Sequence, residues 1–140
     1  MDVREISVRL KRAQQGKQIA VDAALAGLES SLSQWVVLRR IRTLPGASAH
    51  DLAQSAFQTD QSFGALVRRL IERGLVARKP GRGRATMHTL TPKGEALLDQ
   101  CEPIVVATLR EYFSGLTDEE LLQLGALLEK VLQTHESNRA

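Results

Sequence analysis

The sequence predicts a mainly α-helical protein with one small β-hairpin, folded as a single domain. Over most of the 140 residues, apolar side chains recur at the three- and four-residue spacing of helices. The pattern becomes extended only at 75–79 and 85–90, which flank the turn sequence Pro80-Gly81-Arg82-Gly83-Arg84. The length allows one domain to bury its own hydrophobic core.

Composition excludes several classes of function. Hydrophobic residues make up 43% of the chain and charged residues 25%, as in ordinary soluble proteins, and no apolar run reaches membrane-spanning length. The first residues do not resemble a signal peptide, so we expect a cytoplasmic location without membrane association. Cys101 is the only cysteine and the three histidines are scattered, which predicts neither a metal site nor a cofactor. No group of side chains has the spacing of a catalytic site, so we do not expect an enzyme.

Charge is distributed unevenly along the chain. Between 39 and 93 there are eleven arginines and lysines against three acids, a local charge of +8 in a chain of net charge +3, so that the remainder carries −5. A basic middle with acidic ends is typical of a module that binds a polyanion. A solvated basic face is the simpler alternative.

The first helix is expected from about Arg4 to Gly27. Its apolar residues keep a loose helical spacing and are mostly small: Ile6, Leu10, Ala13, Ala20, Ala24 and Leu28. Such a helix is marginally stable alone and needs a partner surface. It is either a frayed terminal helix or an arm that contacts a second copy of the chain.

The second helix is expected to begin at Ser31, which forms a capping-box pair with Gln34, and to stop at Pro45-Gly46. Its buried side is expected to consist of Trp35, Leu38, Ile41 and Leu44. Three arginines are expected on its outer side: Arg39, Arg40 and Arg42.

A helix-turn-helix is predicted next. Ser48 with Asp51 marks a short helix that breaks near Phe57-Gln58, and Thr59 is placed to cap a four-turn helix that ends at Gly74. The apolar face of the longer helix is Phe63, Leu66, Val67, Leu70 and Ile71. Two helices joined by so short a connection form the unit that many regulators insert into DNA.

The opposite face of the longer helix suits DNA. Gln61 and Ser62 come first, and the cations Arg68 and Arg69 follow. Gln61 can form two hydrogen bonds with adenine, whereas arginines in this position suit phosphates. An ordinary amphipathic surface helix would show a similar pattern. The neighbouring segments are therefore needed to distinguish a DNA-binding helix from an ordinary surface helix.

The hairpin supports the DNA-binding interpretation. Its glycine-rich tip carries Lys79, Arg82 and Arg84, and such a tip can reach over a phosphate ridge into the narrow minor groove. We favour Arg84 as the residue that enters the groove. A nucleotide-binding loop is excluded because no Gly-Lys-Ser/Thr sequence and no helix follow the glycines.

Two further helices complete the chain. Thr91-Pro92 begins one that extends to about Phe113, and Pro103 should kink or divide it. A capping box from Thr117 to Glu120 begins the last helix. The apolar side of this helix is too broad to be left in water: Leu121, Leu124, Leu128, Val131 and Leu132.

This succession of elements resembles the MarR family of winged helix-turn-helix transcriptional regulators over essentially the whole chain. The most specific segments are Leu66-Val67-Arg68-Arg69-Leu70-Ile71-Glu72-Arg73-Gly74-Leu75-Val76 and Leu90-Thr91-Pro92-Lys93-Gly94. They look like the family's recognition helix with the first strand of its wing, and like the start of its fifth helix.

The resemblance implies a homodimer that binds a pseudopalindromic operator in double-stranded DNA, represses transcription and responds to a small molecule or an oxidant. It implies one MarR-like domain over 1–140, with a winged helix-turn-helix lobe at about 31–91 and a helical dimerisation region at about 4–28 and 92–136. In this family the cleft beside the second helix is the usual effector pocket, which suggests Trp35 and Leu38 as lining residues. The expected DNA-binding residues are Ser48, Thr59, Gln61, Ser62, Ala65, Arg68, Arg69, Lys79, Arg82 and Arg84.

Two departures from the family pattern keep other functions open. Family wings commonly carry Asp-Arg-Arg, where this chain has Arg82-Gly83-Arg84, and Gly64-Ala65 stands where longer polar residues are frequent. A winged-helix protein–protein adaptor that does not bind an operator is therefore one alternative. A redox-responsive regulator using Cys101 is another, although its apolar neighbours and two nearby acids would raise the thiol pKa.

Overall fold

A computed structural model describes residues 1–81 and 86–139 of the chain. In chain order the elements are α1 (Val3–Leu25), the short 3-10 helix η1 (Ala26–Leu28), α2 (Leu32–Thr43), α3 (Ala49–Ser55), α4 (Asp60–Glu72), β1 (Val76–Pro80), β2 (Thr86–Leu90), α5 (Pro92–Tyr112) and α6 (Asp118–Arg139). Within these ranges, no helix is long and apolar enough to cross a membrane.

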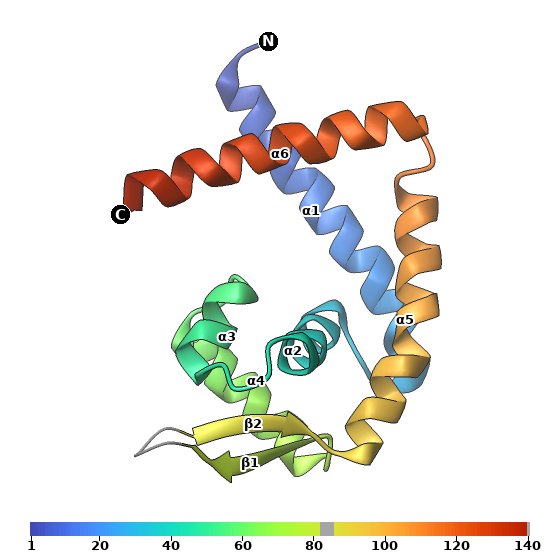
Figure 1. Cartoon of the computed structure of the whole chain (residues 1–140). Coiled ribbons are helices and arrows are strands. Elements are labelled where there is room, and N and C mark those ends of the chain that lie inside the picture. Colours follow the sequence, from blue (N-terminus) through green and yellow to red (C-terminus); the bar gives the residue numbers. More distant parts are fainter. Residues whose placement is uncertain (82–85, 140) are drawn as a thin grey trace.

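The predicted fold class is confirmed. The fold is mainly helical, and its two strands pair antiparallel in a register that extends from Val76 opposite Leu90 to Pro80 opposite Thr86. The short helices α2, α3 and α4 gather beside this hairpin in one lobe, while the long helices α1, α5 and α6 lie to one side of it (Figure 1). The chain therefore has a compact lobe and an extended helical region.

Side-chain caps begin the helices at the predicted places. The hydroxyls of Ser31, Ser48, Thr59 and Thr91 each accept a hydrogen bond from the backbone N–H three residues later. A cap of this kind stabilises a helix by about 1 kcal/mol. Of the pair predicted between Ser31 and Gln34, the bond from the Gln34 N–H to the Ser31 hydroxyl forms at 3.2 Å. The Gln34 side chain does not bond back to Ser31, because it accepts a hydrogen bond from Arg73 Nη1 at 2.8 Å.

The lobe has its own hydrophobic core. Its buried members come from α2, α3, α4, the start of the hairpin and α5: Val37, Leu38, Ile41, Leu52, Ala53, Phe63, Val67, Leu70, Leu75, Val76 and Leu98. Leu44 was predicted to be buried, but its side chain is 39% exposed. The backbone leaves the helical conformation at Leu44, one residue before Pro45, and this turns the side chain away from the core.

A second, smaller cluster joins α1 to α2 and α5. It consists of Val21, Leu25, Leu32, Cys101 and Val105. The stripe predicted for α1 is therefore not its buried face, since Ile6, Leu10 and Ala24 are exposed while Val21 and Leu25 are buried. The C-terminal half of α1 packs against α5, and this intrachain contact selects a different face from the loose periodicity.

The remaining long helices differ in how they are held. The helix α5 continues through Pro103, so of the two predicted outcomes the division is wrong, while the kink stays a prediction. Buried Cys101 and Val105 pack in the cluster with α1 on both sides of the proline. The helix α6 begins at the predicted box, where Thr117 and Glu120 exchange hydrogen bonds of 3.0 and 3.1 Å. Almost all of its side chains are exposed.

Candidate nucleic-acid interface

The helix α4 presents the predicted polar face to solvent. Phe63, Val67 and Leu70 are buried in the lobe, which fixes the rotation of the helix. Gln61, Ser62, Arg68 and Arg69 are exposed, and Ala65 is half-buried between them. The geometry therefore brings a polar first turn and two cations onto one free surface of the lobe.

Two hydroxyls at helix starts are partly used in capping. Ser48 accepts the N–H of Asp51 at 3.1 Å and keeps its own hydrogen for an outside acceptor such as a phosphate. Thr59 accepts the N–H of Ser62 at 3.1 Å and donates to the Ser62 hydroxyl at 3.0 Å. Thr59 thus orients Ser62, whose hydrogen remains available to a base or phosphate.

A contact between α3 and α4 was missed by the sequence analysis. His50 Nδ1 lies 2.9 Å from Asp60 Oδ1, which links the first residues of the two helices. Both side chains are exposed. The pair is ten residues apart in sequence, and only the helix-turn-helix geometry brings it together.

The hairpin adds cations beside α4. Arg78 and Lys79 are exposed on β1, where Arg78 lies opposite His88 and Lys79 opposite Met87. Arg82 and Arg84 lie outside the residues that the structure describes. Arg78 was not predicted as a site residue, yet it lines a groove of about 450 Å³ between α4 and the hairpin, together with Phe63, Gly64 and Thr86.

His88 connects the hairpin to α4. Its ring is buried and meets the Phe63 ring edge to face, with centroids 6.3 Å apart. Burial, and secondarily the charge of Arg78, lower the pKa of His88 below its ordinary value. Its Nδ1 atom has no hydrogen-bond partner among the described residues. A neutral imidazole here serves packing rather than phosphate binding.

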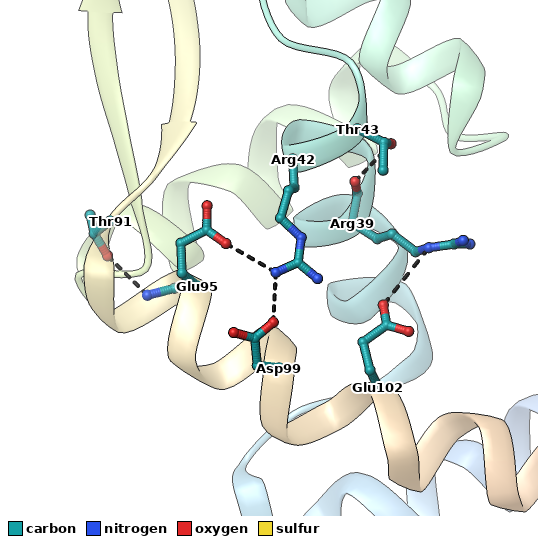
Figure 2. A network of polar contacts seen from close by, with 8 residues as sticks. Arg39, Arg42, Thr43, Thr91, Glu95, Asp99 and Glu102 are labelled. Atoms are coloured by element: carbon teal, nitrogen blue, oxygen red, sulfur yellow. Dashed lines mark hydrogen bonds and ion pairs between the residues drawn. The ribbon is translucent and has the colours of Figure 1, made fainter.

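Two arginines of α2 pair with acids of α5 at the surface of the molecule (Figure 2). Arg42 Nη1 lies 2.7 Å from Asp99 and 3.0 Å from Glu95, and these hydrogen bonds raise the pKa of Arg42. Arg39 Nε lies 3.8 Å from Glu102. The side chain of Arg42 is 33% exposed and lies at the surface, in an ion pair with α5 that the sequence analysis did not predict.

The end of α4 is fastened to the start of α5. The Thr91 hydroxyl donates to the Gly74 carbonyl at 2.6 Å, and Lys93 Nζ donates to the Arg73 carbonyl at 3.0 Å. Any side chain at Gly94 would clash with the Leu75 carbonyl, so the two segments cross in direct backbone contact.

The predicted effector residues, Trp35 and Leu38, lie deeper than the exposed face of α4. Leu38 is fully buried in the lobe core, and Trp35 is half-buried where the two clusters meet. Trp35 Nε1 is buried without a hydrogen-bond partner among the described residues. The guanidinium of Arg39 lies 5.4 Å from the centre of the Trp35 ring.

Cys101 is buried in the second cluster. Burial raises the pKa of its thiol above the ordinary value, and the charge of Glu102 acts in the same direction. A buried, protonated thiol reacts slowly with oxidants. Within the described residues, no three histidine, cysteine or acidic side chains are placed to hold a metal ion.

Comparison with known sequences gives a consistent result. The family model described as "MarR family" matches residues 27–85. The chain is 34% identical over 113 residues to the HTH-type transcriptional repressor Rv2887 of Mycobacterium tuberculosis, and the match covers 79% of this chain and 81% of that protein.

Solved structures share the fold over nearly the whole chain. A mutant of MarR from E. coli complexed with operator DNA is 26% identical, with a TM-score of 0.87 and coverage of 93% of this chain and 95% of that chain. The M. tuberculosis protein Rv2887 in complex with salicylic acid is 33% identical, with a TM-score of 0.71 and coverage of 87% and 92%.

Proposed function

The chain belongs to the MarR family of helix-turn-helix transcriptional repressors, and from this premise we propose that it acts as a homodimer on a pseudopalindromic operator. Each protomer supplies one winged helix-turn-helix lobe, at about 31–91, and dimerises through about 4–28 and 92–136. The exposed face of α4 carries this proposal, because its polar first turn and its two arginines stand free on a helix whose other side is buried. The likeness to MarR in complex with operator DNA supports it.

Each element of the lobe has a distinct role in this proposal. Gln61 reads a base edge, and half-buried Ala65 contacts a thymine methyl. The hydroxyls of the helix starts and the cations hold the phosphate backbone: Ser48, Thr59, Ser62, Arg68, Arg69 and Lys79. Arg82 and Arg84, which lie outside the described residues, are the candidates for the minor groove.

Exposed apolar side chains support the homodimer. In α6 the large exposed residues are Leu121, Leu122, Leu127, Leu128, Val131 and Leu132. Others lie in the first three turns of α1: Val3, Ile6, Val8 and Leu10. A second copy of the same helices can cover this surface, and closed twofold pairing is the commonest solution in oligomers.

A small aromatic carboxylate is the effector class that we propose. The relative Rv2887 was solved with salicylic acid. In this chain we place the effector beside Trp35 and Leu38, because the unpartnered Nε1 of Trp35 offers a hydrogen bond to a ligand oxygen. Trp35 is the only tryptophan, so quenching of intrinsic fluorescence by salicylate provides a direct test.

The DNA-binding proposal is tested by selecting duplexes from a random pool and titrating salt against binding. We expect an inverted repeat with half-sites about one helical turn apart and a steep salt dependence. Gln61→Ala should lose roughly 1–3 kcal/mol of discrimination at one base pair per half-site. Arg69→Ala should weaken binding to all sequences and flatten the salt slope by about one.

A matched control is Arg110→Ala, which removes an exposed arginine of α5 away from the lobe surface and should leave the salt slope unchanged. If no sequence is enriched, and if the salt slope of Arg69→Ala equals that of the wild type just as that of Arg110→Ala does, the protein–protein adaptor becomes the better description.

A further inference from the structure

Three turns in this chain share one backbone geometry. Each follows a helix, and each has a residue with positive φ: Glu29 at 53° after η1, Phe57 at 55° after α3, and Gly74 at 74° after α4. Gly46, the other residue with positive φ among those described, lies in the loop after α2. The comparison between Phe57 and Gly74 is informative, because both turns lie in the lobe.

Hydrogen bonds show that the two lobe turns are equivalent. After α4, the N–H of Leu75 donates to the Leu70 carbonyl and that of Gly74 to Ile71, both at 2.9 Å. After α3, the N–H of Gln58 donates to Ala53 at 2.9 Å and that of Phe57 to Gln54 at 3.0 Å. Both are Schellman caps, in which the residue of positive φ is normally glycine.

Phenylalanine is unfavourable at such a position. A side chain crowds the backbone in the left-handed conformation, and a bulky residue there is a rare outlier. Burial of the ring could compensate, but Phe57 is 78% exposed. The ring therefore contributes little to the stability of the isolated chain.

The position of Phe57 connects it to the DNA-facing surface. It lies in the turn between α3 and α4, two residues before the cap Thr59. In a helix-turn-helix the first helix crosses the phosphate backbone and the start of the second enters the major groove. The exposed side chain of Phe57 belongs to the turn that joins these two elements, four and five residues before Gln61 and Ser62 in the sequence.

We propose that Phe57 is a DNA-contacting residue whose ring packs on the apolar part of the operator beside the bases that α4 reads. The inference rests on the proposed function. In the major groove the apolar group is the thymine C5 methyl, and on the backbone it is the deoxyribose carbons. Either contact excludes water from the ring. The free energy of this burial offsets the cost of the left-handed backbone conformation, and it does so only in the complex.

The test uses the full chain and its selected operator. Phe57→Gly should raise the Tm by about 2–4 °C, because glycine adopts the left-handed conformation without strain. The same variant should bind the operator about five- to tenfold more weakly, as expected for loss of one apolar contact. Phe57→Tyr keeps the ring and should stay close to the wild type in both measurements.

The matched control is Glu29→Gly. Glu29 is exposed and has the same backbone geometry, but it lies between α1 and α2 in the other part of the molecule. This variant should also raise the Tm, while operator affinity stays within about twofold of the wild type. A loss of affinity confined to position 57 separates the DNA contact from a general effect of glycine.

Replacing each operator thymine by deoxyuridine distinguishes the two DNA groups. Loss of affinity at one position for the wild type, absent in Phe57→Gly, assigns the contact to the thymine methyl; no such position assigns it to the deoxyribose. The proposal is overturned if Phe57→Gly lowers the Tm, if it keeps wild-type affinity, or if sedimentation shows that its weaker binding comes from dissociation of the dimer. If the wild type selects no operator, the proposed function fails as well.

Discussion

The lobe and the terminal helices of this protein differ in how much of their structure a single chain can account for. The lobe closes its core with residues of its own helices, its hairpin and the start of α5. The helix α6 and the first half of α1 leave most of their large apolar side chains exposed. The lobe is thus complete within one protomer, whereas the terminal helices lack a covering surface.

The helix α5 packs in both regions and connects them. Its first half contributes Leu98 to the lobe core, and its middle contributes Cys101 and Val105 to the cluster with α1. The fastening of Thr91 and Lys93 to the end of α4 makes the recognition helix follow α5. Under the proposed function, we expect a ligand that shifts α5 to change the position of α4 without altering its exposed side chains.

The largest effect is expected from charges on α6. The double substitution Leu127→Glu with Val131→Glu places two carboxylates on one face, and burying them unpaired costs several kcal/mol. We expect the dimer dissociation constant to rise at least about a hundredfold and operator binding to be lost with it. Sedimentation equilibrium measures the first, and fluorescence anisotropy the second.

The same experiment tests whether the lobe is independent. Emission of Trp35 in the dissociated double variant should match that of the wild type if the lobe core stays closed. Gln133→Glu adds a carboxylate on the opposite side of α6 and should leave the dimer intact. An unchanged dimer in the double variant would show that this face of α6 does not contact a second copy.

A smaller effect is expected at the crossing of α5 over the start of β1. A methyl group at Gly94 would clash with a backbone carbonyl that cannot move independently, so Gly94→Ala should lower the free energy of unfolding by about 3 kcal/mol. Gly64→Ala is the control, because no atom lies within 4 Å of the added methyl group. It should stabilise α4 by up to about 1 kcal/mol. Urea unfolding measures both, and equal stabilities would contradict the tight crossing.

Features that depend on neighbours in sequence could be predicted. The caps at Ser48, Thr59 and Thr91 and the change from helix to strand after Gly74 were located correctly, because hydroxyl caps and glycine act over three or four residues. Leu44 was placed on the wrong side, and the ion pairs of Arg42 were not predicted. Helical periodicity fixes which residues share a face, but the backbone turn at Leu44 and the acids of α5 decide where these two side chains point.

The candidate site shows the same division. The exposed side of α4 followed from its apolar periodicity. The contact of His50 with Asp60 and the position of Arg78 beside α4 needed the three-dimensional arrangement. Phe57 was recognised as a break, but nothing in the sequence marks a phenylalanine as left-handed.

The smallest expected effect is the pH dependence of the Tm that His88, inside the lobe, contributes. Because its pKa is lowered by burial, the unfolded chain binds a proton more readily than the folded chain once the pH falls below about 6.5. The wild-type Tm should therefore fall by a few degrees between about pH 7.5 and pH 5, and His88→Gln should lack this component. His135→Gln, at an exposed position of α6, should keep the wild-type pH dependence. His88 packs inside a lobe whose core is closed within one chain. The pH effect of His88 on the Tm should therefore not vary with protein concentration, whereas the stabilisation that comes from contacts of α6 with a second copy should. If the pH effect of His88 on the Tm varied with protein concentration, His88 would lie in the dimer contact. The lobe would then not be complete within one chain.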